Sequence, residues 1–278
     1  MAPRELHGYR HDVHFRARDD LHVYRGLSRL FDARLVSDSE LNLTAHPTYQ
    51  AQPGAENFLR RWDVHDPGFS GDMHRYINEI MVSSSFLSAE GAVQDRWSRV
   101  NFPWTPFDRE GVLGGPHRTG REFARVDLAL AELKELATVE RWPIPTATGT
   151  AVDQLAVDTE GRLVLLELKD ARKRSSDVYY SPFQLLQYVW EWNDVLAAVR
   201  SNIQAVIDAR VEVGLTSGGL PPLEGGIRAA VGFGADLRSP EVRRRYCLVL
   251  DVVGSYLPDS IAPMETWAIS ESGPVPLI

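Results

Sequence analysis

Residues 151–169 read AVDQLAVDTEGRLVLLELK and form the most clearly patterned part of this 278-residue chain. Two apolar segments, TAVDQLAVD (150–158) and RLVLLELK (162–169), flank the short turn TEG. Two such segments separated by a short glycine-containing turn predict a β-hairpin. The run LVLL is apolar on both faces, which is typical of a strand buried inside a sheet. We therefore expect this hairpin to form the centre of a fold.

Three charged residues lie at one end of the predicted hairpin. Side chains alternate between the two faces of a strand, so Glu167 and Lys169 share one face. Asp153 lies near the start of the preceding strand, and an antiparallel hairpin places the start of one strand beside the end of its partner. Burying any of these charges alone would cost several kcal/mol. Two carboxylates and an ammonium group are therefore expected to converge at this end.

Such a cluster suits a divalent cation. Two neighbouring carboxylates repel each other, and their oxygen atoms are ligands that Mg²⁺ or Mn²⁺ prefers. A bound cation lowers the pKa of a coordinated water and holds a phosphate oxygen. A lysine beside it could orient that water or neutralise charge on the phosphate, whereas an arginine stays protonated and would serve less well as a proton carrier. Only three of the 30 lysine and arginine residues are lysines, which makes Lys169 notable.

Helices and strands are predicted on both sides of the hairpin. An amphipathic helix, REFARVDLALAELKELA (121–137), precedes it. The helix SPFQLLQYVWEWNDVLAAV (181–199) follows, with Ser181 as its N-cap and Pro182 in its first turn. A second helical segment at 202–211 and three further strands come next, at 227–234 (IRAAVGFG), 246–253 (YCLVLDVV) and 264–270 (METWAIS).

Several of these elements together resemble the PD-(D/E)XK nuclease superfamily, and specifically its RecB-like branch. The resemblance extends over about residues 119–200. Its motif residues are Asp153 in AVDQLAVD, Glu167 and Lys169 in LLELK, and Gln184 and Tyr188 in QLLQY, which fit the Gln-x-x-x-Tyr signature of that branch.

The resemblance implies a metal-dependent DNA endonuclease or exonuclease. Asp153 and Glu167 would bind Mg²⁺ or Mn²⁺ with help from the Leu168 carbonyl, and Lys169 would act at the attacking water. Gln184 and Tyr188 would line the site and contact the DNA backbone.

The superfamily often carries a further acidic residue on the first helix. Glu122 is our choice for this role, and Glu132 and Glu135 compete with it. The chain departs from the family pattern in three respects: Val152 replaces a common proline before Asp153, the four-cysteine cluster of some members is absent, and there is no GxxxxGK[ST] loop.

The expected fold class is α/β or α+β, with a restriction-endonuclease-like mixed sheet flanked by helices in a nuclease-like domain at 111–278. Residues 1–110 form a separate N-terminal region of undetermined mixed α/β fold, for target recognition or partner binding. Its predicted elements are a strand at 9–17 and helices at 19–36 and near 56–62, 73–82 and 90–100. Proline and glycine in NFPWTPFDREGVLGGPHRTG (101–120) predict a loop or linker between the two regions.

Composition excludes several classes of protein. No apolar run approaches the length of a membrane span, and the first 20 residues contain no apolar signal segment, so a cytoplasmic protein without membrane contact is expected. The single cysteine, Cys247, excludes disulfides and cysteine-based clusters within one chain. The net charge of −8 argues against a protein that coats DNA, although it allows a local basic groove.

Other candidate features have two interpretations each. DARKR (170–174) could be a phosphate-contacting loop or a solvated run of charges. Tyr179 and Tyr180 could stack on bases or pack in the core. Histidines of the first region could form a second metal centre. The candidate groups are His7, His11 and His14, and separately His65 and His74 with Asp66 and Asp72. His117 is close to Glu122 in the sequence and could reach the active site.

Two functions are therefore carried forward from the sequence. The first is a Mg²⁺-dependent deoxyribonuclease, acting in defence, repair or the handling of mobile elements. The alternative is a catalytically inactive nuclease-fold scaffold subunit of a larger nucleic-acid-processing or defence complex. DNA, a protein partner and a second copy of the chain are the partners considered.

Overall fold

The computed structural model divides into two compact units, Met1–Asp95 and Arg96–Ile278. The described residues are 5–6, 9–10, 12–15, 20–25, 28–81, 89–100, 103–111, 123–143, 151–172, 176–216, 218–270 and 272–278.

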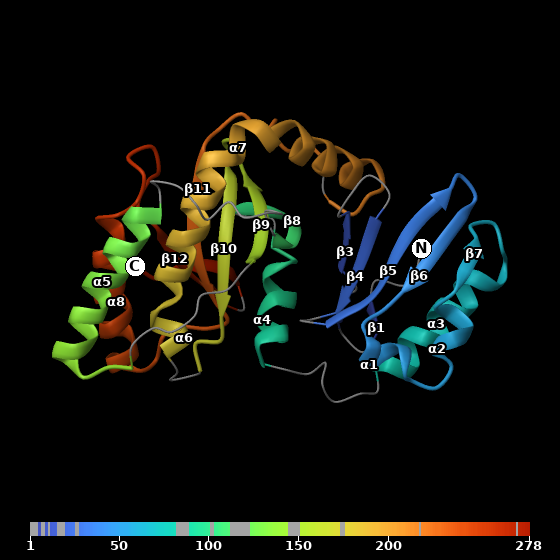
Figure 1. The fold of residues 1–278 in the computed structure, drawn as a ribbon, viewed down its shortest axis with the longest axis horizontal. Coiled ribbons are helices and arrows are strands. Elements are labelled where there is room, and N and C mark those ends of the chain that lie inside the picture. Colours follow the sequence, from blue (N-terminus) through green and yellow to red (C-terminus); the bar gives the residue numbers. More distant parts are fainter. Residues whose placement is uncertain are drawn as a thin grey trace. The chain divides into compact units, whose positions relative to one another are not determined.

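A six-stranded mixed sheet forms the centre of the second unit, with the strand order β13-β12-β11-β10-β9-β8 (Figure 1). Strand β9 is antiparallel to both of its neighbours, β8 and β10. Strands β10, β11 and β12 run parallel, and β13 is antiparallel to β12. The strands are β8 (Trp104–Gly111), β9 (Val152–Asp158), β10 (Leu163–Lys169), β11 (Ile227–Phe233), β12 (Glu265–Ser270) and β13 (Gly273–Pro276).

The predicted hairpin is confirmed as β9 and β10. Its register pairs Leu165 with Leu155 and Leu166 with Gln154. Gly161 in the turn has a φ of +71°, and a Cβ at this position would lie 2.2 Å from the Pro222 carbonyl oxygen. The turn therefore requires a glycine for both conformation and space.

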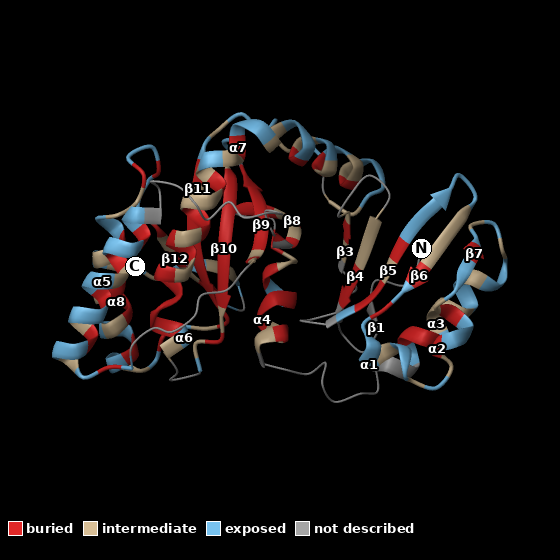
Figure 2. Ribbon diagram, in the orientation of Figure 1, coloured by how far each residue is buried: buried red, intermediate tan, exposed pale blue. Residues whose placement is uncertain are grey.

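Helices cover one face of this sheet, and Trp97 packs against the other. Residues of α5 (Phe123–Glu140), α7 (Ser181–Glu212) and α8 (Pro240–Gly254) share one core with Leu163 and Leu165 of β10. On the other face, a Cβ on Gly232 would lie 2.9 Å from the indole of Trp97, the last residue of α4 (Ala89–Trp97). Strands β10 and β11 are accordingly buried along most of their lengths (Figure 2). Among the described residues, no helix is long and apolar enough to cross a membrane.

Two predictions for the C-terminal part of this unit are wrong. The segment 246–253 is not a strand but part of α8, because Val242, Tyr246, Val249 and Val253 are buried at helical spacing. Ser239 caps this helix by accepting a hydrogen bond from the Val242 amide. The two helices predicted between 181 and 211 form the single helix α7.

Two local predictions also need correction. Ser181 does not cap α7; Tyr180 is at the N-cap position, and the Ser181 hydroxyl donates to the Val178 carbonyl at 2.8 Å. Part of the predicted linker 101–120 forms the edge strand β8, paired to β9 with a bulge between Pro106 and Asp108. Proline has no N–H group to donate, which is tolerated here because some amide groups of an edge strand have no neighbouring strand to pair with.

The first unit contains a five-stranded antiparallel sheet with the order β3-β4-β5-β6-β7 and a separate β1-β2 pair. Phe31, Phe58, Trp62 and Tyr76 are buried together in its core. The elements are β1 (Glu5–Leu6), β2 (Tyr9–Arg10), β3 (Asp12–Phe15), β4 (Asp20–Arg25), β5 (Ser28–Ser37), β6 (Glu40–Thr44), α1 (Pro47–Gln50), α2 (Ala55–Phe58), β7 (Arg61–Asp63) and α3 (Gly68–Met81).

The helix predicted at 19–36 is wrong, since this segment forms β4 and β5. Phe31 and Ala33 are buried, whereas Asp32 is half-buried and Arg34 is exposed. This alternation has the strand period of two, and the cross-strand partners of β4 and β6 support it. The strand predicted at 9–17 overlaps β2 and β3, and the helices predicted near 73–82 and 90–100 correspond to α3 and α4.

Candidate active site

Asp153 and Glu167 lie next to each other at one end of the β9–β10 hairpin. The last paired residues of the register are Leu166 and Gln154, so the next pair along the two strands is Glu167 and Asp153. Directly opposite residues of an antiparallel pair point to the same face. The Asp153 carboxylate also accepts a hydrogen bond from the Leu168 amide at 2.7 Å, through its Oδ2 atom. The hairpin thus holds two carboxylates side by side.

Lys169 completes this cluster. Its ammonium nitrogen Nζ lies 2.6 Å from Oε1 of Glu167, and the side chains are 12% and 3% exposed. On the neighbouring strand β11, Val231 and Phe233 are the register partners of Glu167 and Lys169. Both are fully buried, so the ion pair lies against an apolar wall. Charges interact more strongly in such surroundings than in water.

The Leu168 carbonyl is available on the same side as Asp153. The amide and carbonyl of one strand residue point to the same edge of the strand, and the Leu168 amide points to Asp153. The Lys169 carbonyl points the other way, because it accepts a hydrogen bond from the Gly234 amide at 3.1 Å. One carbonyl and two carboxylates therefore lie at the same end of the hairpin.

Two side chains of α7 belong to the surroundings of this cluster. Tyr188 is 2% exposed, and burial together with the negative charges of Glu167 and Asp153 raises the pKa of its phenol. The phenol consequently remains protonated and can donate a hydrogen bond. Gln184 lies one helical turn earlier, so it is on the same face of α7. Its buried Oε1 atom has no hydrogen-bond donor among the residues that the structure describes.

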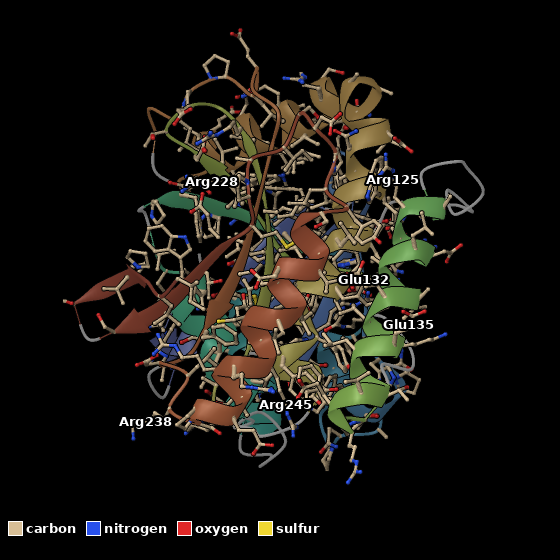
Figure 3. The ribbon with its side chains drawn as sticks, turned by 90° about the vertical axis from the view of Figure 1, so that its left-hand side faces the viewer. Arg125, Glu132, Glu135, Arg228, Arg238 and Arg245 are labelled. Carbon is tan, nitrogen blue, oxygen red and sulfur yellow. The ribbon has the colours of Figure 1, made fainter. Side chains whose placement is uncertain are left out.

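The acidic candidates of the first helix do not join the cluster. Glu122 lies outside the described residues. Glu132 and Glu135 are both exposed on α5, whose inward side carries buried residues such as Leu133 (Figure 3). Glu132 instead accepts a hydrogen bond from the Tyr256 hydroxyl at 2.8 Å. Neither competitor is therefore a candidate ligand in this arrangement.

The donor set fits a small hard cation. In the described part of the chain, no group of three or more His, Cys, Asp or Glu side chains could hold a metal ion. Mg²⁺ does not need such a group, because enzymes commonly bind it through one or two carboxylates together with substrate phosphates. Asp153, Glu167 and the Leu168 carbonyl offer only oxygen atoms, which suits Mg²⁺ or Mn²⁺.

Tyr179 and Tyr180 pack in the core and are not available to stack on bases. They are 1% and 4% exposed. The Tyr179 ring contacts the edge of Trp142 with 5.8 Å between ring centroids, and the Tyr180 hydroxyl donates to the Pro143 carbonyl at 3.0 Å. Burial raises the pKa of Tyr180 to about 12.

No histidine-based metal site is found among the described residues. His14 is buried against the edge of Tyr24, with 5.4 Å between ring centroids. Asp72, which we considered together with His65, Asp66 and His74, forms an ion pair with Arg75. His7, His11 and His117 lie outside the described residues.

Asp170 and Arg172 form a contact that the sequence analysis did not identify. Asp170 is 5% exposed, and its carboxylate accepts hydrogen bonds from the Arg172 amide, at 3.2 Å, and from the Arg172 side chain. The sequence signal was present, since an aspartate often binds the backbone amide two residues later in a turn.

A buried ionic network stabilises the opposite end of the hairpin. Asp158, whose side chain is fully buried, accepts a hydrogen bond from Arg162 Nε at 2.6 Å and one from Arg228 Nη1 at 3.3 Å. Arg228 also forms two hydrogen bonds with Glu265, at 2.6 and 2.7 Å. Several hydrogen bonds from Arg162 and Glu160 outweigh the effect of burial and lower the pKa of Asp158. This network orders the hairpin from its far end.

Comparison with known proteins identifies no relative. No protein-family model, no curated protein and no solved structure matches the chain. The geometry of Asp153, Glu167 and Lys169 is therefore the main indication of function.

Proposed function

We propose that the second unit is a metal-dependent nuclease of the RecB-like PD-(D/E)XK type that hydrolyses phosphodiester bonds of DNA. The observation that supports this most is the pair of opposed carboxylates, Asp153 and Glu167, with the Lys169 ammonium 2.6 Å from Glu167. A mixed sheet flanked by helices, with this hairpin near its centre, is consistent with a restriction-endonuclease-like core.

The residues divide the chemistry between them. Asp153, Glu167 and the Leu168 carbonyl would hold Mg²⁺ or Mn²⁺, which when bound lowers the pKa of water and offsets phosphate charge. The Lys169 ammonium donates hydrogen bonds that can orient the attacking water or neutralise charge that develops on the phosphate. The buried Tyr188 phenol can donate a further hydrogen bond to the bound phosphate. Attack in line with the leaving 3′-oxygen would leave a 5′-phosphate.

The surroundings of the site favour such a role for Lys169. The Lys169 side chain is 12% exposed, so water screens its charge less than at the protein surface. Its position is fixed by β10 and by the ion pair with Glu167. A donor held in place before the reaction loses little energy in reorganising, which is the usual basis of electrostatic stabilisation in enzymes.

A catalytically inactive scaffold subunit with the same fold is the second candidate. The net charge of −8 favours it, because DNA is itself an acidic partner. It predicts that no DNA is cleaved with any metal, and that the protein co-purifies with a stable protein partner or as a homodimer.

Cleavage assays distinguish these two functions. Supercoiled, linear and single-stranded DNA, with RNA in parallel, would be incubated with Mg²⁺ or Mn²⁺ and with EDTA. We expect metal-dependent cleavage by the wild type and a loss on the order of 100-fold or more in Lys169→Ala and Asp153→Ala. Lys134→Ala, which changes an exposed lysine of α5, is the matched control and should retain full activity. Activity that survives in Lys169→Ala or Asp153→Ala would refute this assignment.

A further inference from the structure

A fixed arginine lies three residues beyond Lys169. Arg172 Nε donates to Asp170 Oδ1 at 2.9 Å and Nη2 donates to Oδ2 at 3.3 Å, while the Arg172 amide donates to Oδ1 at 3.2 Å. Asp170 is almost completely buried, whereas the Arg172 side chain is 68% exposed. A buried carboxylate thus fixes one edge of an exposed guanidinium group.

The other edge of this guanidinium group is available to an anion. Arginine has five N–H donors, and Asp170 takes the one on Nε and one of the two on Nη2. Among the residues that the structure describes, the two N–H groups of Nη1 and the second one of Nη2 have no acceptor, and the side chain is 68% exposed. Asp170 raises the pKa of Arg172, so the group keeps its positive charge. Paired N–H donors of this kind match two oxygen atoms of a phosphate.

The position of Arg172 along the chain places it near the candidate active site. Arg172 is three positions after Lys169, and an extended chain spans at most about 3.6 Å per residue, so the two Cα atoms lie within about 11 Å. Successive phosphates of one DNA strand are about 3.4 Å apart along the helix axis. The two side chains add their own reach of several ångström, so a phosphate that contacts Arg172 would lie within a few phosphates of the one that is cleaved.

We propose that Arg172 is a phosphate-binding residue that contacts the DNA backbone within a few phosphates of the cleaved phosphodiester, and that Asp170 positions it. This proposal rests on the proposed nuclease function, because it assumes that the same site receives DNA. The ion pair with Asp170 restricts the arginine side chain before DNA binds, which reduces the entropy lost on binding. The contact carries charge but reads no base, so it contributes affinity without sequence preference.

The salt dependence of DNA binding tests this contact directly. Binding of a fluorescent duplex would be measured by anisotropy in EDTA between about 50 and 200 mM KCl, a range over which phosphate contacts have large effects. Arg172→Ala should reduce the magnitude of the slope of log K against log salt by about 0.9, the value for one phosphate contact. Arg172→Lys should keep most of that slope.

Two further variants separate this contact from a general effect of charge. Arg244 is 55% exposed and forms an ion pair with Glu140 at 2.6 Å, so Arg244→Ala removes a comparable arginine from α8. Its slope should equal that of the wild type. Asp170→Asn leaves Arg172 charged but weakens its fixation, so affinity should fall at every salt concentration while the slope changes little. In cleavage assays Arg172→Ala should raise KM and leave kcat nearly unchanged, because it removes a contact made equally to bound DNA and to the transition state.

The outcomes distinguish this proposal from the nuclease function. A slope that is unchanged in Arg172→Ala, or reduced equally in Arg244→Ala, overturns the phosphate contact even if the wild type cleaves DNA. A wild type that binds DNA with the expected Arg172 dependence but cleaves none refutes the nuclease function and supports the contact. A wild type that binds no DNA overturns the contact as well.

Discussion

Replacing Lys169 by methionine tests whether the charge cluster is as strongly coupled as the geometry indicates. The substitution keeps the length of the side chain and leaves Glu167, 3% exposed, beside Asp153 without the ammonium group. Removing one partner of a buried ion pair costs about 3–5 kcal/mol of the free energy of unfolding. Lys169 is itself 12% exposed, so water can reach the site and we expect a value near the lower end, about 3 kcal/mol.

Urea denaturation and thermal unfolding in EDTA, both followed by tryptophan fluorescence, measure this loss. For a unit of this size, a change of 1 kcal/mol shifts Tm by about 2–4 °C, so Tm should fall by about 6–12 °C. Adding Mg²⁺ or Mn²⁺ should restore more stability to Lys169→Met than to the wild type, because a bound cation then takes the place of the ammonium charge.

Two control variants accompany this measurement. Lys134→Met, on the exposed side of α5, should change the free energy of unfolding by less than about 0.5 kcal/mol. The double variant Glu167→Gln with Lys169→Met should be more stable than Lys169→Met alone, since it removes the uncompensated carboxylate. The coupling is refuted if Lys169→Met loses less than about 1 kcal/mol, or if the double variant is no more stable than the single one.

Three further predictions concern the hairpin and its surroundings. Asp158→Asn should cost about 3 kcal/mol of the free energy of unfolding at pH 7. Because the folded pKa of Asp158 is lowered, its carboxylate stabilises the fold above the unfolded pKa of about 4. In urea denaturation, the difference from the wild type should therefore disappear as the pH falls through the folded pKa. Gly161→Ala should destabilise the protein by more than Gly214→Ala. Both glycines have positive φ, but of the two only Gly161 has a neighbouring atom within 4 Å of the new Cβ, the Pro222 carbonyl oxygen. Equal unfolding midpoints of the two variants would contradict this. Tyr188→Phe removes a buried hydroxyl and should lower kcat by about 10-fold while costing only about 1 kcal/mol of stability; an unchanged kcat would assign Tyr188 a packing role alone.

The hairpin and its charged end could be predicted because the signals are local. The strand pattern, the turn TEG and the spacing of Asp153 and Glu167 all lie within residues 151–169, so the register follows from nearby residues. The strands at 227–234 and 264–270 were also predictable from short apolar runs bounded by turns.

The errors arise where one segment satisfies two periods. Residues 19–36 contain a helical stripe of leucines, and only pairing with distant strands selects β4 and β5. In 246–253 the apolar run suited a strand, whereas the helical spacing is visible only when Val242 is included. Strand β8 has few local signals and forms because β9 offers an unpaired edge. The turn between Asp170 and Arg172 has a sequence signal, but the burial of Asp170 is visible only in the structure.

Cleavage of supercoiled plasmid by the wild type and by Lys169→Ala, with Mg²⁺ and with EDTA, is the decisive measurement for the nuclease site. We expect cleavage only by the wild type with the metal present. Three results would contradict a metal-dependent nuclease site at Asp153, Glu167 and Lys169. They are equal cleavage by Lys169→Ala, cleavage that persists in EDTA, and a wild type that cuts no DNA with either Mg²⁺ or Mn²⁺.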